Sequence, residues 1–264
     1  MQLDTLTYEL QDDGVAIVTL NRPDRMNTLG GTMKPDLSVL YKDVMLNDRS
    51  VRCVVMTGAG DRAFCAGADI KERAANRPHP AEYFAKQKYT HELFRAIEQF
   101  ERPVIAAING VALGGGLELA LCADIRIAAD HARLGLTEVN LGVLPAAGGT
   151  QRLPRAIGES RAKELMFTGR MMNADEALEI GLVSRVVPQA DLMDTALTLA
   201  RQIAAKPPLS VSFIKQAVNA GIEVGIDAGL DFERYAAAML MDSEDRKEGM
   251  QAFLDKRKPQ FKGR

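Results

Sequence analysis

The sequence has no tryptophan and little cysteine, and this scarcity argues against both disulfide bonds and metal sites. Its three cysteines, Cys53, Cys65 and Cys122, are an odd number and lack the spacing of metal ligands. They indicate a reducing compartment rather than a disulfide-bonded secreted domain. The three histidines are scattered and form no zinc motif, so we expect no bound metal.

An excess of charge of either sign is also missing. Lysine and arginine number 33 and aspartate and glutamate 35, for a formal net charge of −2. A generally basic nucleic-acid-binding protein is therefore not expected. The chain of 264 residues is 47% hydrophobic and 26% charged, as in ordinary globular proteins, which excludes disordered and low-complexity chains.

Targeting and membrane signals are absent as well. The first ten residues have neither the basic segment nor the apolar stretch of a signal peptide. Residues 103–123 carry one charge, Glu118, and are long enough to span a bilayer, but Asn109-Gly110 and Gly114-Gly115-Gly116 interrupt them. A buried strand, a turn and a buried helix explain this run better, so we expect a cytoplasmic protein with no membrane partner.

Apolar runs bounded by turn residues predict strands at 6–10, 15–20, 51–57, 104–108, 125–129 and 183–187. Asp13-Gly14 joins the first two as a hairpin. Helical spacing is found over residues 33–45 and 81–100. Alternating helices and nearly continuous apolar strands predict an α/β fold with mostly parallel pairing.

No strand is predicted beyond residue 187. Lys206-Pro207-Pro208, Gly221 and Gly225 divide the remaining chain into helices. We therefore expect two regions, a core at residues 1–195 and a helical C-terminal region at residues 196–264.

Two carboxylates stand in unusually apolar surroundings. Glu118 is the only charge in residues 103–123, and Glu138 is the only charge in residues 134–150. One such glutamate is most often a helix-terminal residue with an unseen partner, but two beside glycine-rich turns favour a function. Burial and mutual repulsion should raise and separate their pKa values, as general acid–base catalysis at neutral pH requires.

Two stretches of backbone are candidate hydrogen-bond donors. Gly114-Gly115-Gly116 precedes the helix that carries Glu118, where N–H groups are unpaired and a ligand oxygen can approach closely. A tight turn with close helix packing is the alternative. Asp69 and Glu72 have the spacing of a capping box, which predicts a helix from Ile70 and leaves the N–H of Ala68 free.

Other chemistries lose support. Cys65 has no neighbour in the sequence that would activate it as a nucleophile. The sequence has no Walker loop, G-x-G-x-x-G, G-x-S-x-G or H-E-x-x-H motif. Phosphoryl transfer, dinucleotide binding, serine hydrolysis and zinc catalysis are therefore not expected.

Five segments, in order, carry a resemblance to a known family: AFCAGADIKE (63–72), PVIAAINGVALGGGLELALCADIRIA (103–128), LGVLPAAGGTQRLPRAIG (141–158), TGRMMNADEALEIGLVSRVVP (168–188) and FLDKRKPQFK (253–262). Through them the chain resembles the crotonase (enoyl-CoA hydratase/isomerase) superfamily nearly end to end. The resemblance implies a spiral of ββα units followed by a helical trimerisation region. It also implies a homotrimer or a homohexamer built from two trimers.

The resemblance also implies a reaction. The N–H groups of Ala68 and Gly115 would bind the thioester carbonyl of an acyl-CoA, Glu118 would be the base and Glu138 the acid. The product of hydrating a trans-2-enoyl-CoA would be a 3-hydroxyacyl-CoA, in fatty-acid or related acyl-CoA degradation. No metal or redox cofactor is needed, because the CoA belongs to the substrate.

Contacts with the CoA are implied for a set of residues that match the family's binding segment and C-terminal basic position: Ala66, Ala68, Asp69, Ile70, Lys71, Gly115 and Lys256. Backbone groups of this segment would lie near the adenine and Lys71 near a phosphate. Lys256 would reach a phosphate in its own or a neighbouring subunit. By charge pattern alone, Lys256-Arg257-Lys258 is typical of a solvated helix end.

The sequence departs from the family's commonest pattern at three places. Thr137 stands where proline usually precedes the second glutamate, Ala146 replaces a glycine, and Leu29-Gly30 differs from the usual Asn-Ala-Leu-Asn continuation. None of these removes a catalytic group. We expect Thr137 to change the aim of Glu138 and with it the substrate range.

Two alternatives stay open within the enzymes, a Δ3-Δ2-enoyl-CoA isomerase and a dehydratase of a special 3-hydroxyacyl-CoA such as carnitinyl-CoA. An isomerase can work with Glu138 alone, so an intact Glu118 argues against it. A non-catalytic RNA-binding or scaffold relative is the alternative of another class. It rests on five positive charges in residues 256–264, and the net charge argues against it.

Overall fold

The computed structural model describes residues 3–76 and 78–264. Its larger sheet has the strand order β1-β2-β3-β5-β7-β10, with these bounds: β1 (Leu6–Leu10), β2 (Val15–Leu20), β3 (Cys53–Gly58), β5 (Val104–Ile108), β7 (Ile125–Ala129) and β10 (Arg185–Val187). The predicted hairpin is confirmed, since β1 pairs antiparallel with β2, and the other pairs are parallel.

A smaller sheet has the order β4-β6-β8-β9 and consists of very short strands: β4 (Ala63–Cys65), β6 (Val111–Leu113), β8 (Arg133–Gly135) and β9 (Met172–Asn173). Each of β4, β6 and β8 follows a strand of the larger sheet and leads into a helical segment. These repeated ββα units confirm the predicted α/β spiral. Strands of two or three residues are too short to show an apolar alternation in sequence, and none of the four was predicted.

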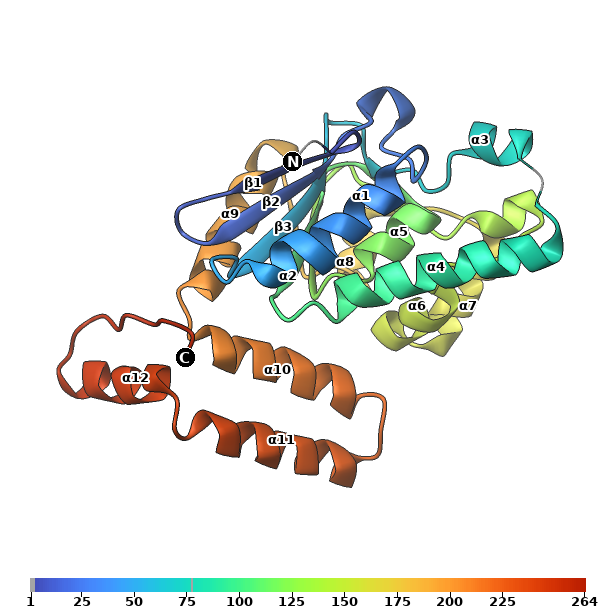
Figure 1. Cartoon of the computed structure of the whole chain (residues 1–264). Coiled ribbons are helices and arrows are strands. Elements are labelled where there is room, and N and C mark those ends of the chain that lie inside the picture. Colours follow the sequence, from blue (N-terminus) through green and yellow to red (C-terminus); the bar gives the residue numbers. More distant parts are fainter. Residues whose placement is uncertain (1–2, 77) are drawn as a thin grey trace.

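Helices cover both faces of the larger sheet (Figure 1). On one face lie α1 (Met33–Val39), a π-helical turn (Leu40–Val44), α2 (Met45–Asn47) and α4 (Pro80–Glu98). On the other face α9 (Leu192–Ala204) packs against alternate residues of the strands, among them Val55 and Ile105. The nearly continuous apolar strands are thus explained by burial on two sides.

The remaining helices of the core are short, and several border the site described below: η1 (Pro23–Arg25), α3 (Ile70–Ala75), α5 (Gly115–Ala120), η3 (Glu138–Leu141), α6 (Gly149–Ile157), α7 (Glu159–Thr168), α8 (Ala174–Glu179) and η4 (Gln189–Asp191). Residues 103–123 fold into β5, β6 and α5, which confirms the predicted buried strand and helix and adds the short strand β6 between them. Among the described residues, no helix is long and apolar enough to cross a membrane.

Three C-terminal helices extend away from the sheets (Figure 1): α10 (Pro208–Gly221), α11 (Ile226–Leu240) and α12 (Glu244–Leu254). The expected division at residues 195 and 196 falls inside α9, which packs on the sheet, so the extended part begins only after Ala204. Lys215 of α10 is buried and donates to Asp124 at 2.8 Å, which ties the extension to the core.

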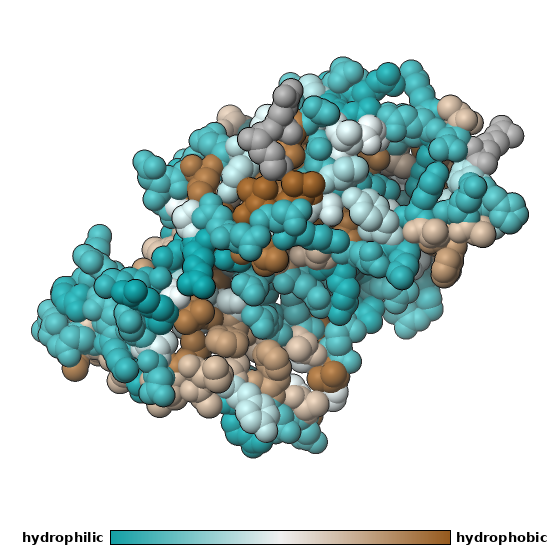
Figure 2. Space-filling model, in the orientation of Figure 1, coloured by the Kyte–Doolittle hydropathy of each residue, from teal (hydrophilic) through white to brown (hydrophobic). Residues whose placement is uncertain are grey.

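Apolar residues gather on the surface of α10 and α11 (Figure 2). Large side chains that would normally be buried are exposed here: Ile214, Val218, Ile222, Ile226, Leu230, Tyr235 and Met239. An exposed apolar surface of this extent is typical of a protein–protein contact.

Candidate active site

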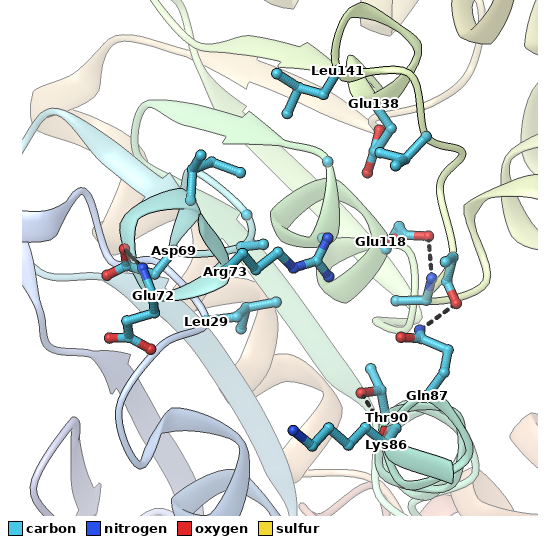
Figure 3. Close-up of a pocket in the computed structure, with 18 of the residues that line it drawn as sticks. Leu29, Asp69, Glu72, Arg73, Lys86, Gln87, Thr90, Glu118, Glu138 and Leu141 are labelled. Atoms are coloured by element: carbon cyan, nitrogen blue, oxygen red, sulfur yellow. Dashed lines mark hydrogen bonds between the residues drawn. The ribbon is translucent and has the colours of Figure 1, made fainter. Parts of the chain in front are cut away.

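One cavity brings together the two glutamates and the two backbone donors that the sequence singled out. It has a volume of about 510 Å³, and Ala68, Gly115, Glu118 and Glu138 all line it (Figure 3). Its walls come from α1, α3, α4, α5 and the segment from Thr137 to Ala147. Residues up to 118 positions apart, from Leu29 to Ala147, thus share one space.

Glu118 is held at the inner wall of this cavity. Its side chain is on α5 and the residue is only 2% exposed. Its Oε1 accepts hydrogen bonds from the N–H groups of Ala147 at 2.7 Å and Gly149 at 2.8 Å. Burial raises the pKa of Glu118, and the two N–H donors and Arg152 oppose the rise. The expected burial and upward pKa shift are confirmed, and the donors stabilise the ionised form.

The loop that supplies these two N–H groups is fixed from α4. The carbonyl oxygen of Ala146 accepts hydrogen bonds from Gln87 Nε2 at 2.5 Å and lies 2.6 Å from His91 Nε2. Arg152 donates to both carboxylate oxygens of Glu98, at 2.8 and 2.9 Å. Sequence reasoning missed these residues, because on a helix such as α4 they are indistinguishable from ordinary surface residues.

Glu138 lies at the start of η3, across the cavity from Glu118 (Figure 3). Its Oε2 is buried and has no hydrogen-bond partner among the described residues. Its carboxyl group lies over Gly114, where an added Cβ would come within 2.8 Å of Oε1. Burial, together with the charge of Glu118, raises the pKa of Glu138 to about 7. Such a group is partly protonated at neutral pH and can donate a proton.

Ala68 and Gly115 present free N–H groups on neighbouring stretches of chain. Neither N–H donates a hydrogen bond within the part of the chain that the structure describes. Gly67 directly precedes Ala68 and has φ +88°. A Cβ there would lie 2.6 Å from the carbonyl oxygen of Leu113 and 3.2 Å from the nitrogen of Gly115. Only glycine permits this close approach, which places the two donors on one wall.

The predicted capping box at α3 is half confirmed. Asp69 caps the helix by accepting from the N–H groups of Lys71 at 3.2 Å and Glu72 at 3.3 Å. Glu72 does not complete the box, which corrects that prediction. Its carboxylate instead accepts from the N–H of Gly31 at 3.0 Å and from Arg22 at 3.2 Å.

The segment around the unusual Leu29-Gly30 therefore supports the donor loop. The N–H of Leu29 donates to the carbonyl of Gly67 at 2.8 Å, and the side chain of Leu29 lines the cavity. Thr137, another departure from the family's pattern, also lines the cavity directly before Glu138.

The residues expected to contact CoA divide into two groups. Ala66, Ala68, Asp69, Ile70 and Gly115 line the cavity. Two lysines do not reach it. Lys71 is exposed and is absent from the lining, and Lys256 follows α12 at the opposite end of the molecule from α3 (Figure 1). A contact between Lys256 and this cavity within one chain is thereby excluded.

Three cations of the cavity were not predicted. Lys34 of α1, Arg73 of α3 and Lys86 of α4 are among its lining residues. On the sequence they belong to ordinary amphipathic helices, and no motif marks them. Figure 3 shows the guanidinium of Arg73 extending from α3 toward α5.

Clustered His, Cys, Asp and Glu side chains can bind metals, and exposed thiols can act as nucleophiles. Within residues 3–76 and 78–264, no three His, Cys, Asp or Glu side chains are grouped so that they could hold a metal ion. Cys65 is buried, and burial raises the pKa of its thiol to about 12. A thiol with so high a pKa is a poor nucleophile.

Comparison with known proteins places this geometry in context. Residues 11–264 match the enoyl-CoA hydratase/isomerase family. The short-chain-enoyl-CoA hydratase of Clostridium acetobutylicum is 43% identical over 265 residues, which cover 100% of both chains. The crotonyl-CoA hydratase of Syntrophomonas wolfei is 42% identical over 254 residues, or 95% of each chain. The crystal structure of an enoyl-CoA hydratase from Bacillus anthracis superposes with a TM-score of 0.95, at 43% identity, covering 99% of this chain and 100% of that one.

Proposed function

The chain belongs to the enoyl-CoA hydratase/isomerase family, and from this we propose that it hydrates a trans-2-enoyl-CoA to a 3-hydroxyacyl-CoA. One observation carries the proposal. A buried carboxylate, Glu118, and a half-buried one, Glu138, share a cavity with the unpaired N–H groups of Ala68 and Gly115.

The N–H groups of Ala68 and Gly115 bind the oxygen of the thioester carbonyl. Water adds to C3 and leaves negative charge on that oxygen, as in an enolate. Two donors that are already in place stabilise this charge without reorganising, and removing one such donor typically costs about 10²–10³ in rate. The two chain segments that carry these donors approach closely because Gly67 has no side chain, and a residue with a Cβ at this position could not allow the same approach.

Glu118 takes the proton of the attacking water. The N–H groups of Ala147 and Gly149 bind its Oε1 and favour the ionised form, which the base requires. They also fix the direction in which the carboxylate points. The other oxygen is left for the water molecule.

Glu138 supplies the proton that C2 receives. Its pKa of about 7 keeps a substantial fraction protonated at neutral pH. Oε2 is buried and receives no hydrogen bond from any described residue, which keeps this proton from competing partners. Two N–H groups oppose protonation of Glu118 whereas Glu138 stays partly neutral, which is the division that acid–base addition needs.

The CoA lies along residues 66–70, whose backbone and side chains line the mouth of the cavity. Lys71 is exposed beside this segment and reaches a phosphate there. Lys256 can serve a phosphate only from a neighbouring subunit, because it lies far from the cavity of its own chain.

The exposed apolar surface of α10 and α11 is the contact that assembles the protein. Ile222 is 67% exposed and Ile226 74% exposed in the single chain. Leaving such side chains in water costs about 25 cal/mol per Å² of apolar area. A homotrimer, alone or paired as a hexamer, buries this surface and brings the α12 end of one chain toward another.

An isomerase that moves a double bond is the second candidate. The free Oε2 of Glu138 favours it, because one unpartnered carboxyl group can carry a proton from one carbon to another. Glu118 would then be a buried acid without a catalytic role.

Crotonyl-CoA distinguishes the two functions. The loss of its conjugated-thioester absorbance measures hydration by the wild type, Glu118→Gln and Glu138→Gln. A hydratase loses several orders of magnitude in both variants. If the wild type does not hydrate crotonyl-CoA but shifts the double bond of a 3-enoyl-CoA, and Glu118→Gln still does so, the protein is an isomerase.

A further inference from the structure

The side of the cavity formed by α1, α3 and α4 carries three cations. Lys34, Arg73 and Lys86 line it from three different helices. None of the three has a carboxylate within 4.0 Å among the described residues. The acidic lining residues Asp69 and Glu72, by contrast, both pair with Arg22, at 3.4 and 3.2 Å.

Lys34 is the most enclosed of these cations. Its Nζ donates to the hydroxyl of Thr90 at 2.9 Å, and Thr90 is only 2% exposed. An ammonium group has three donors, and this contact with a neutral hydroxyl is the one that the described residues provide. Burial and the charge of Arg73 lower the pKa of Lys34, and the charge of Glu118 opposes part of this shift. A half-buried ammonium without an anion is costly, so an arriving anion would be favoured.

Arg73 faces the same space from the other side. Its guanidinium extends from α3 toward Glu118 (Figure 3), and no described side chain or carbonyl accepts a hydrogen bond from it. A guanidinium presents a planar pair of donors that fits a carboxylate. Lys34 and Arg73 therefore offer an ammonium and a guanidinium to one ligand.

Glu118 acts on these cations only through space, since its charge raises the pKa of Lys34 and the charge of Arg73 lowers the pKa of Glu118, but it forms no ion pair with either. Glu118 is already held by two N–H groups, and Arg152 also lowers its pKa. Glu138 must keep its proton to act as the acid, and a cation nearby opposes that by lowering its pKa, as Arg73 does here. Cations placed for the catalytic pair alone would thus work against one of its members.

An apolar wall lies on the Glu138 side of the cavity (Figure 3). Leu141, Val143 and Leu144 line the cavity from the loop after Glu138. The methylene groups of an acyl chain fit against these side chains. A purely aliphatic chain would, however, cover Lys34 and Arg73 without offering a polar group in place of the water that hydrates them. A tail with a cationic end, such as that of carnitinyl-CoA, would be repelled.

We propose that the cationic side of the cavity binds a carboxylate at the far end of the acyl chain, with Lys34 and Arg73 as its ligands. The preferred substrates are then the CoA monothioesters of unsaturated dicarboxylic acids. This inference rests on the proposed function, since it takes Ala68 and Gly115 to hold the thioester.

Three substrates of equal chain length test the proposal. They are trans-2-hexenoyl-CoA, the CoA monothioester of trans-2-hexenedioic acid, and the methyl ester of that monothioester, which is neutral. We expect kcat/KM for the acid to exceed that for both neutral substrates by about 10-fold to 100-fold, as for hydrogen bonds to charged groups. Equal values for all three would overturn the subsite while leaving the hydratase function intact.

Variants show whether the cations are responsible. In Lys34→Met and in Arg73→Met the ratio of kcat/KM between acid and hexenoyl thioester should fall by about 10-fold. Lys34→Arg should keep most of the ratio, because it keeps the charge. Lys88→Met is the matched control, since Lys88 is an exposed cation of α4 outside the cavity lining. Using a ratio cancels any general loss of activity, so equal losses for both substrates would also overturn the proposal.

Binding without turnover separates the subsite from the reaction. The saturated pair, hexanoyl-CoA and the CoA monothioester of hexanedioic acid, can be titrated calorimetrically. Tighter binding of the acid, lost in Lys34→Met, supports the subsite even if no hydration is seen. Equal affinities would count against it, whatever the outcome for the proposed function.

Discussion

The N–H of Gly149 donates to Glu118 Oε1 at 2.8 Å, although 31 residues separate the two in the sequence. The same oxygen accepts from Ala147 at 2.7 Å. The direction of the base is thus set by a loop rather than by the helix that carries it. Because α4 holds this loop at Ala146, residues that touch no substrate control the catalytic geometry.

Removing the support of that loop should reduce turnover. In the double variant Gln87→Leu/His91→Leu, the Ala146 carbonyl loses both contacts and the loop loosens. We expect kcat for crotonyl-CoA to fall roughly 10-fold with a smaller change in KM, since a misplaced base costs rate more than binding. The weaker N–H bonds should also move the acidic limb of the pH profile upward. Lys88→Met on the same helix should change neither kcat nor the pH profile. An unaltered kcat and pH profile in the double variant would show that the loop does not position Glu118.

The pH dependence of the reaction should be bell-shaped. At low pH Glu118 becomes protonated and cannot act as the base, so kcat/KM rises with pH. Above about 7 Glu138 loses its proton, and kcat/KM falls again. Initial rates from pH 5 to 9 measure both limbs. A profile that stays flat between pH 7 and 9 would show that Glu138 is not the acid.

The raised pKa of Glu138 also predicts a pH-dependent stability. The folded protein binds this proton more tightly than the unfolded chain, so ionising Glu138 destabilises the fold. This cost is absent below the unfolded pKa of 4.5 and fully present above about 7. Glu138→Gln should therefore raise Tm more at pH 8 than at pH 5, by roughly 2–4 °C, as expected for about 1 kcal/mol in a chain of this size. Scanning calorimetry at the two pH values checks this, and an equal shift at both would contradict it.

Close packing at the triple glycine predicts a large effect of a single methyl group. A Cβ on Gly116 would lie 1.9 Å from the carbonyl oxygen of Cys65, which is backbone and cannot move away. We expect Gly116→Ala to destabilise by about 3 kcal/mol and to lower Tm by roughly 6–12 °C. Gly221→Ala is the control, because a Cβ there meets nothing within 4 Å. Equal melting temperatures for the two variants would refute the close contact.

The apolar surface of α10 and α11 should govern assembly. Val218→Asp/Ile222→Asp places two charges on a surface that is exposed in the single chain. Burying them without partners is costly, so we expect the variant to sediment as a monomer and the wild type as a trimer or hexamer. Phe167→Asp changes a side chain that is 72% exposed on α7 and should leave the assembly intact. A wild type that is itself monomeric would remove the basis for this contact.

Most of the long elements could be predicted from local patterns. The hairpin of β1 and β2 and the strands β5 and β7 begin and end at the predicted residues, because each strand is an apolar run and turn residues mark its ends. The four strands of the smaller sheet were missed, since they pair only after other units have positioned them. Glu72 was assigned to its own helix end, but Gly31 and Arg22 are its partners in the fold.

The sequence by itself singled out two glutamates beside glycine-rich turns, because a lone charge in an apolar run has no polar surroundings of its own; the fold buries Glu118 and half-buries Glu138. It also determined the family, through motifs whose order and spacing are local. Only the tertiary structure decided what these groups contact. The partners of Glu118 come from Ala147 and Gly149, and Lys34 meets Thr90 across 56 residues. Such contacts depend on how distant segments pack together, and neither the periodicity nor the composition of the sequence specifies the relative positions of those segments.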